Sequence, residues 1–333
     1  MNTTAFPKYG AALVALAICS ACAGGSAVAP SAGAFDAGHV GRAVSVNGRL
    51  VTAAHPNMSV LPPYAAILPD RRAKSKTFEY IINDYGTYAS IFDYPKSTKQ
   101  IGQITNVGGQ GCTNVLYGYG KKIFWIVAGD DQITEYRVPK KPLKTLSDSV
   151  GQPSSCAMDA NGDLAVGILS NGDIDIFKHA TGSGTVMSTP LRQEFFDGYD
   201  NHGNLFFDGF NNDGVFELVE LPKGSKTLQA IATSNTVKFP GSVQWDGTYL
   251  TVTDQEADAM YRYTISGTQA RLKGTVALTG ASDCAQTWIA ASVVYCGDTG
   301  SGGEVFAYPA GGSPIAVFTG NFDLPLGVVA AKQ

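Results

Sequence analysis

Six short stretches rich in apolar residues recur along the chain at nearly regular intervals. Each contains β-branched or aromatic residues, closes on an apolar or aromatic residue, and is followed by a more variable polar stretch. The stretches are SIFDY (90–94), QITEY (132–136), DIDIF (173–177), GVFEL (214–218), AMYRY (259–263) and EVFAY (304–308). Their second residues, from Ile91 to Val305, lie 42, 41, 41, 45 and 45 positions apart. This period indicates a repeat architecture whose units bury their apolar faces against their neighbours.

Each repeat also contains an earlier apolar stretch, and turn residues precede several of these stretches. The apolar stretches lie at 78–84, 123–130, 164–173, 204–209, 249–254 and 292–298. The segments DANGD, DNHGN and DG between strand patterns are hairpin signals. Four strands in 41 to 45 residues make one propeller blade. The sequence therefore predicts an all-β fold, a six-bladed β-propeller of four-stranded antiparallel blades over residues 67–331.

The two ends of this repeat region are complementary. The first repeat begins at its second strand, whereas the chain ends with LPLGVVAA (324–331), which matches the inner-strand segment FPGSVQWD (239–246). We expect 327–331 to pair with 78–82, so that the C-terminal strand closes blade one and removes the open edges of the ring.

Composition narrows the function classes. The chain has 333 residues, of which 44% are hydrophobic and 16% charged, and its net charge is -4. It has no run of Lys or Arg, so a nucleic-acid partner is not expected. The 39 glycines suit many short strands joined by tight turns.

The N-terminus has the features of an export signal. Lys8 precedes the apolar stretch 10–18, which is too short to span a bilayer. The segment around Cys22 resembles a bacterial lipoprotein signal, which implies lipidation of Cys22 after cleavage. Cys19 stands where such signals usually have Leu, so secretion without a lipid stays open. We predict an export signal at 1–22, an Ala/Gly/Ser/Pro-rich tether and irregular lead-in at 23–66, and a membrane-anchored, periplasmic or secreted protein that meets the membrane only through this anchor.

The repeats resemble a known group of propellers. The order of features in each repeat is similar to that of NHL and YVTN-type repeats: an inner strand, Asp, Gly-Asn or Asn-Gly, a second strand, and then a strand that ends in an aromatic residue. GNLFFDG (203–209) and YPAGG (308–312) resemble segments of uncharacterised secreted propellers of environmental bacteria. The resemblance implies the fold and leaves function open, because such repeats serve binding, scaffolding and enzymatic roles.

Four cysteines follow the signal. In an exported chain an even number favours disulfides, with three possible connectivities. Cys284 and Cys296 flank a candidate hairpin, and Cys112 and Cys156 occupy the same place in two successive inner strands. We favour these two pairings, with buried thiols as the alternative. Zinc is not expected, because these four cysteines have no CxxC spacing and the four histidines are not paired.

Acidic residues that recur in the repeats are interpreted as turn residues. They are Asp84, Asp208, Asp254 and Asp298 at the ends of second strands, and Asp159, Asp200 and Asp246 in the hairpins. Such side chains bond backbone N–H groups of the adjacent loop. His202, in the hairpin YDNHGN, is interpreted in the same way.

Acidic residues that break the repeat are better candidates for function. Asp130 and Asp131 form a pair, Gln255 and Glu256 follow Asp254, and Asp283 precedes an inner-strand cysteine. If they converge at the channel mouth they could hold Ca²⁺, the one cofactor we consider, and a bound cation could polarise an ester or lactone. The chain resembles six-bladed lactonases in this respect only, and it has no GxSxG or HExxH motif.

Tyrosines offer a second type of site. Tyr85, Tyr88, Tyr117 and Tyr119 lie in or near predicted turns. Aromatic side chains beside polar groups can stack on sugars or hold a peptide, whereas the alternative is packing between blades.

These observations favour a monomeric, non-catalytic propeller that binds or scaffolds a protein, peptide or glycan, and no residue is assigned as catalytic. The alternative is a cation-dependent, lactonase-like hydrolase or lyase. A purely structural envelope component is the third possibility.

Overall fold

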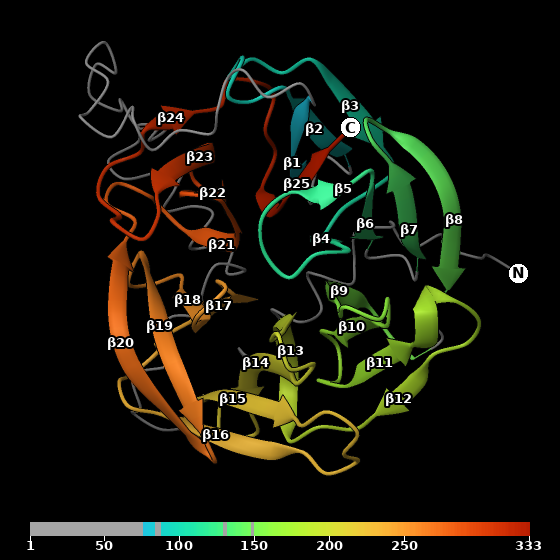
Figure 1. The fold of residues 1–333 in the computed structure, drawn as a ribbon, viewed down its shortest axis with the longest axis vertical. Coiled ribbons are helices and arrows are strands. Elements are labelled where there is room, and N and C mark those ends of the chain that lie inside the picture. The colour runs from blue at the N-terminus through green and yellow to red at the C-terminus, as the bar shows by residue number, and fades with distance from the viewer. Residues whose placement is uncertain (1–75, 84–87, 129–131, 148–149) are drawn as a thin grey trace, which may run out of the picture.

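The computed structural model describes residues 76–83, 88–128, 132–147 and 150–333, which form strands β1 to β25 and one 3₁₀ helix at Lys178–Ala180. Figure 1 shows the sheets arranged in a ring, as in a β-propeller. The all-β propeller prediction is therefore confirmed. Among the described residues, no helix is long and apolar enough to cross a membrane.

The strand order follows the chain around the ring. One sheet contains, in order, β3 (Gly102–Thr105), β2 (Tyr88–Phe92), β1 (Thr77–Asn83), β25 (Pro325–Lys332) and β5 (Gly120–Lys121). The next contains β4 (Gly111–Thr113), β6 (Ile123–Ala128), β7 (Gln132–Arg137) and β8 (Lys141–Ser147). A third contains β9 (Pro153–Met158), β10 (Leu164–Ile168), β11 (Ile174–Phe177) and β12 (Thr185–Met187).

The remaining strands form an eight-stranded sheet and a four-stranded sheet. The first half of the eight-stranded sheet contains β13 (Leu191–Tyr199), β14 (Leu205–Asn211), β15 (Phe216–Leu221) and β16 (Gln229–Thr233). Its second half contains β17 (Pro240–Trp245), β18 (Leu250–Asp254), β19 (Ala259–Ser266) and β20 (Gln269–Ala277). The last sheet contains β21 (Cys284–Ala290), β22 (Val293–Asp298), β23 (Gly302–Ala307) and β24 (Ala316–Val317).

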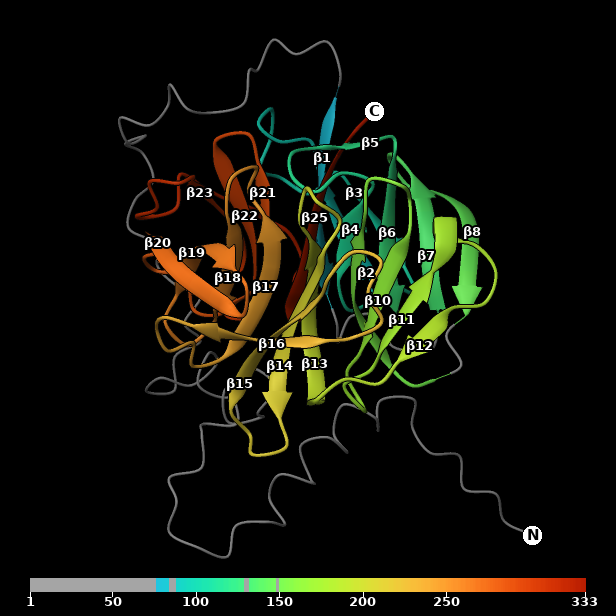
Figure 2. The same ribbon diagram turned by 60° about the horizontal axis from the view of Figure 1, so that its bottom comes forward.

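The two halves of the eight-stranded sheet join at their outer edges. β16 pairs in parallel with β20, with Ala232 opposite Gln269 and Thr233 opposite Ala270. Figure 2 shows β16 reaching β20 at the rim of the ring. This pairing gives two neighbouring sheets a contact that the repeat pattern does not predict.

The C-terminal strand closes the ring. β25 is antiparallel to β1, with Phe78 opposite Ala331 and Ile82 opposite Gly327. This register is the predicted one, and the prediction is confirmed. The side chains of Val328 and Val329 are fully buried, because the sheet packs between neighbours on both faces.

The second residues of the six recurring stretches mark the repeat, and five of these six marker residues are buried in the third strand of a blade-like set of strands. These are Ile91, Ile133, Ile174, Met260 and Val305.

Val215 is the sixth marker residue, and its assignment to the third strand is wrong. It precedes β15 and is 58% exposed. β14 extends to Asn211, whose side chain accepts hydrogen bonds from the backbone N–H groups of Asp213 and Val215. The turn is thus displaced along the chain, and Leu218 takes the buried position.

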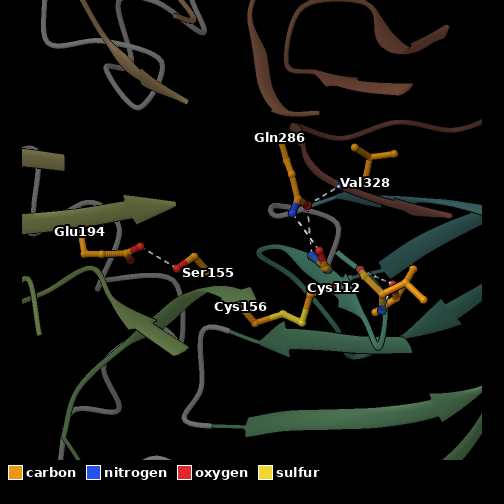
Figure 3. Close-up of a disulfide and its surroundings, with 9 residues drawn as sticks. Cys112, Ser155, Cys156, Glu194, Gln286 and Val328 are labelled. Carbon is orange, nitrogen blue, oxygen red and sulfur yellow. Dashed lines mark hydrogen bonds between the residues drawn. A yellow bond between two sulfur atoms is a disulfide. The ribbon is translucent and has the colours of Figure 1, made fainter. Parts of the chain in front are cut away.

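Two disulfides join elements of the ring. Cys112–Cys156 links β4 to β9 across two sheets, and Cys284–Cys296 joins β21 to β22 within one sheet. These are the pairings that the sequence favoured. Figure 3 shows the first of them.

Candidate functional site

The connections between strands divide the molecule into two ends. We call the end with the turns between first and second strands the hairpin face; it carries residues 114–122, 159–163, 200–204 and 246–249. The opposite face carries the turns between second and third strands, at 212–215, 255–258 and 299–301. In antiparallel sheets successive turns alternate between the two ends.

The residues proposed from sequence do not form one site. Tyr85, Asp130, Asp131 and the lipidation candidate Cys22 lie outside the described residues. Tyr88, Glu256 and Asp283 lie towards the opposite face, whereas Tyr117 and Tyr119 lie on the hairpin face.

Glu256 and Asp283 occupy different environments on the opposite face. Glu256 is exposed, and its Oε1 lies 3.3 Å from Lys238 Nζ. Asp283 is 2% exposed and accepts a hydrogen bond of 3.0 Å from Thr299 Oγ1. Burial, followed by the charge of Asp298, raises the pKa of Asp283 well above its usual value. Of the described repeat-breaking carboxylates, one is thus paired at the surface and the other is enclosed.

The described residues do not assemble a metal site from the predicted ligands. Within the part of the chain that the structure describes, the one group of three His, Cys, Asp or Glu side chains close enough to share an ion is Cys284, Cys296 and Asp298. Its two sulfurs are bonded to each other, so neither is a thiolate ligand.

The hairpin aspartates have the predicted turn role. Asp200 Oδ1 accepts backbone N–H bonds from His202 at 2.8 Å and Asn204 at 2.9 Å. Asp159 makes the same bonds to Asn161 and Asp163, both at 2.8 Å. The prediction is confirmed for both hairpins, and His202 is an exposed turn residue.

Of the three described strand-end aspartates, two are turn residues and one is not. Asp254 accepts backbone N–H bonds from Lys238 and Phe239. Asp298 accepts them from Ser282 and Gly300.

Asp208 is the exception, and the turn prediction is wrong there. It is fully buried, and neither of its oxygens has a well-aligned hydrogen-bond partner among the described residues. Burial raises its pKa, and the nearby backbone N–H groups of Phe196 and Gly241 oppose this only in part. Asn211 caps the longer strand in its place.

The loop between β4 and β5 closes the channel on the hairpin face. Figure 1 shows this connection reaching into the centre of the ring. Leu116 O accepts a hydrogen bond from Gln244, and Gly118 both donates to Ile289 O and accepts from Trp288 Nε1. These contacts fix the loop to β17 and β21 on the far side of the ring.

The two loop tyrosines have different roles. Tyr119 OH lies 2.7 Å from Tyr295 OH, and the ring packs against the core cluster that contains residues of β1 and β25. Tyr117 is 49% exposed and lies over the 246–249 hairpin, where a Cβ added to Gly247 would be 3.0 Å from its ring. Only Tyr117 is therefore available to a ligand.

Behind the loop the channel leaves a small cavity lined by Asp197, Ser242 and Gln286. The centre of a water molecule can occupy about 30 Å³ of it. One water needs roughly 10–15 Å³ by this measure. The cavity can therefore hold a few waters, but it is too small for a sugar ring or a peptide side chain with its backbone.

A larger cleft opens on the hairpin face between the two halves of the eight-stranded sheet. Water can occupy about 360 Å³ of it. Its lining includes Asp200, Asn204, Phe206, Glu220, Pro222 and Ile265. We call it the β15–β19 cleft, after the strands of Glu220 and Ile265. The sequence analysis did not find Glu220, because a polar residue within a strand pattern is typical of a solvated face.

The fold and the closed channel define a β-propeller with an open cleft on one face. A search of solved structures returned a chain from the crystal structure of a nidogen/laminin complex, at 14% identity and a TM-score of 0.62 over 77% of this chain and 98% of that chain. It also returned a protein of unknown function from Bacteroides caccae, at 12% identity and a TM-score of 0.59 over 77% and 99% of the two chains. At these identities the likeness shows the fold alone.

No family model matches the chain, and no curated protein does either. The resemblance to NHL and YVTN-type repeats therefore stays a prediction.

Proposed function

We propose that this protein is an exported, six-bladed binding propeller that holds a protein partner on its hairpin face. The blade count treats β13–β16 and β17–β20 as separate blades, because each runs from an inner strand to an outer one and, among the described residues, the short β16–β20 pairing is the only strand pairing between them. A noncatalytic role fits the closed channel and the separate environments of Glu256 and Asp283.

The observation that carries the proposal is the contrast between channel and surface. The channel cavity lies behind residues 114–119 and admits only small species. On the same end of the ring, Tyr117 is exposed and the β15–β19 cleft is open. A large partner can reach these surface features without entering the ring, and Tyr is well suited to an interface. A peptide or a glycan could use the same exposed aromatic side chain.

Two further observations are consistent with this role. Disulfides persist in oxidising compartments, which supports export through the segment 1–22 and, in our proposal, lipidation at Cys22. One of the similar folds comes from a complex between two proteins, so the architecture is compatible with protein binding.

A capture experiment on envelope extract tests the proposal. The purified protein is immobilised beside two variants, Tyr117→Arg on the hairpin face and Val215→Arg on the opposite face. The two residues are 49% and 58% exposed, so both substitutions should leave the core intact. We expect a protein retained by the wild type and by Val215→Arg, and retained about tenfold less by Tyr117→Arg.

Equal retention by all three proteins, or loss only with Val215→Arg, would contradict the choice of face. Retention that disappears after enzymatic removal of glycans from the extract would identify a glycan ligand instead of a protein one.

A further inference from the structure

The β15–β19 cleft contains two acidic side chains without a matching positive charge at its floor. Asp200 is 8% exposed, and its oxygens are used by the hairpin turn. Glu220 is also 8% exposed and lines the cleft, with no hydrogen bond or ion pair to any described residue. Burial and then the charge of Asp200 raise the pKa of Glu220. The carboxylate is therefore directed to the cleft, where a cationic group can pair with it.

The neighbouring sheet shows which partner this position accepts. In each half of the eight-stranded sheet, the residue pairs between the second and third strands can be counted from the hairpin face. The first pair is Leu205–Leu221 in β13–β16 and Leu250–Tyr263 in β17–β20. The second pair is Phe206–Glu220 in β13–β16 and Thr251–Arg262 in β17–β20. Glu220 therefore occupies the register position of Arg262. In the β9–β12 sheet the same position holds Ile176, which carries no charge.

Arg262 neutralises the hairpin carboxylate of its own sheet. Its Nε lies 2.8 Å from Asp246 Oδ2, and its guanidinium group lies 4.6 Å from the ring centre of Tyr249. Burial alone would raise the pKa of Asp246, but hydrogen bonds from Tyr308, the backbone N–H groups of Tyr249 and Thr248, and Arg262 outweigh it and lower the pKa. A guanidinium is thus the group that this hairpin geometry accommodates.

The β13–β16 sheet has the opposite arrangement. A second carboxylate stands at the guanidinium position, and an open cleft lies beside it. Phe206, Pro222 and Ile265 supply apolar walls for an aliphatic stem. Two basic side chains lie beside these carboxylates: His202, which also lines the cleft, is exposed with Nδ1 3.5 Å from Asp200 Oδ2, and the exposed Lys223 lies over Gly203.

We propose that the β15–β19 cleft binds the guanidinium or ammonium group of a basic side chain from the protein partner. This proposal rests on the proposed function and adds the chemistry of the contact. The partner's Arg or Lys supplies to Asp200 and Glu220 the charge that Arg262 supplies to Asp246. Arg is favoured over Lys, because its planar fork can bond two acceptors at once.

Small probes test the cleft without the partner. Binding of N-acetyl-L-arginine amide to the full chain is measured by NMR titration, with N-acetyl-L-citrulline amide as the neutral ligand of nearly the same shape. We expect saturable, millimolar binding of the arginine amide and at least about tenfold weaker binding of the citrulline amide. Equal binding of the two probes, or no saturable binding of either, would overturn the proposal.

Three variants assign the binding to Glu220. Glu220→Gln keeps the shape and should weaken arginine-amide binding about tenfold. Glu217→Gln changes the charge equally on the same strand but outside the cleft lining, and should bind as the wild type does. Glu220→Arg should abolish probe binding and leave the melting temperature equal or higher, because it reproduces the arrangement at Arg262.

The alternative outcomes are distinct. Equal losses in the Glu220→Gln and Glu217→Gln variants, or calcium chloride binding at Glu220 in place of the arginine amide, would overturn the proposal. If N-acetyl-L-arginine amide does not bind, the proposal that the cleft holds a basic side chain is rejected. The proposal of protein binding on the hairpin face is then unaffected, because it is tested separately with Tyr117→Arg.

Discussion

Gln286 joins three inner strands at the place where the ring closes, and its replacement should weaken the whole domain. Its Oε1 accepts hydrogen bonds from the backbone N–H groups of Gly111 at 3.1 Å and Val328 at 2.8 Å. Its Nε2 donates to Gly111 O at 2.8 Å. The side chain is 5% exposed and connects β21 to β4 and β25, as Figure 3 shows.

The size of the effect follows from the number of backbone groups that lose a partner. Gln286→Met keeps the length of the side chain and removes all three hydrogen bonds. A buried polar group left without a partner costs about 1–3 kcal/mol. Because Gln286 also lines the cavity that can hold a few waters, part of this loss can be recovered. We therefore expect the lower end of the sum, about 3 kcal/mol of unfolding free energy.

Urea denaturation followed by tryptophan fluorescence measures the loss, with Trp288 on the same strand as a reporter. The midpoint should fall while the slope stays that of the wild type. The matched control is Gln193→Met on β13, where the side chain is half-buried and accepts a hydrogen bond of 3.2 Å from exposed Arg192; its change should stay within about 0.5 kcal/mol. A Gln286→Met variant within about 1 kcal/mol of this control would refute the reasoning.

Three other predictions follow from the same structure. Replacing Cys112 and Cys156 together by Ala opens a bond that spans 44 residues, which should lower the unfolding free energy by about 4 kcal/mol on the chain-entropy scale, measured by urea denaturation without reductant. Deleting 325–333 removes β25 and should abolish the cooperative thermal transition and increase protease sensitivity throughout the domain; survival of one sharp transition would contradict the closure argument. Burial and then the charge of Asp298 raise the pKa of Glu304 to about 8, so the native state binds a proton that the unfolded state has lost. The stability of the wild type relative to Glu304→Gln should therefore fall from pH about 4.5 to about 8 and then level off. A pH-independent difference would show that Glu304 does not titrate in this range.

The local pattern predicted the elements that depend on local properties. A short apolar stretch with β-branched or aromatic residues, bounded by turn residues, indicates a strand wherever it occurs, and Ile91 and Met260 from two such stretches are buried in strands as expected. The closing register was also predictable, because a missing inner strand at the start and an extra one at the end have only each other as partners. Cys112 and Cys156 could be paired because they occupy equal places in adjacent repeats.

The wrong predictions for Asp208 and Val215 arose in one repeat, where the second strand extends beyond the recurring aspartate although the sequence motif is the same. Asp208 and Val215 belong to a stretch that looks like the others, yet β14 continues to Asn211 and shifts the turn. The same residue types then have new positions, so Asp208 is enclosed and Val215 is exposed. A sequence window cannot show which of two adjacent polar residues caps a strand, because the choice depends on how far the partner strand extends.

The candidate site was even less accessible from sequence. Tyr117 and Tyr119 share one loop and one composition, and only the contact with Tyr295 separates the packed ring from the exposed one. Glu220 can be recognised as a candidate binding residue only from two features of the structure: it occupies the strand-register position that Arg262 occupies in β17–β20, and it lines an open cleft. Glu220 and Arg262 are about forty positions apart, and Tyr119 and Tyr295 are 176 positions apart.

The amino-acid sequence alone therefore determined the class of fold, its repeat length and the way in which its ends meet, because period, β-branched content and turn residues act over short distances. Tertiary structure decided which end of the ring is closed, which acidic residues are turn caps and where an acidic cleft opens. These properties depend on contacts between different sheets, such as the pairing of β16 with β20, and no local pattern encodes such a contact.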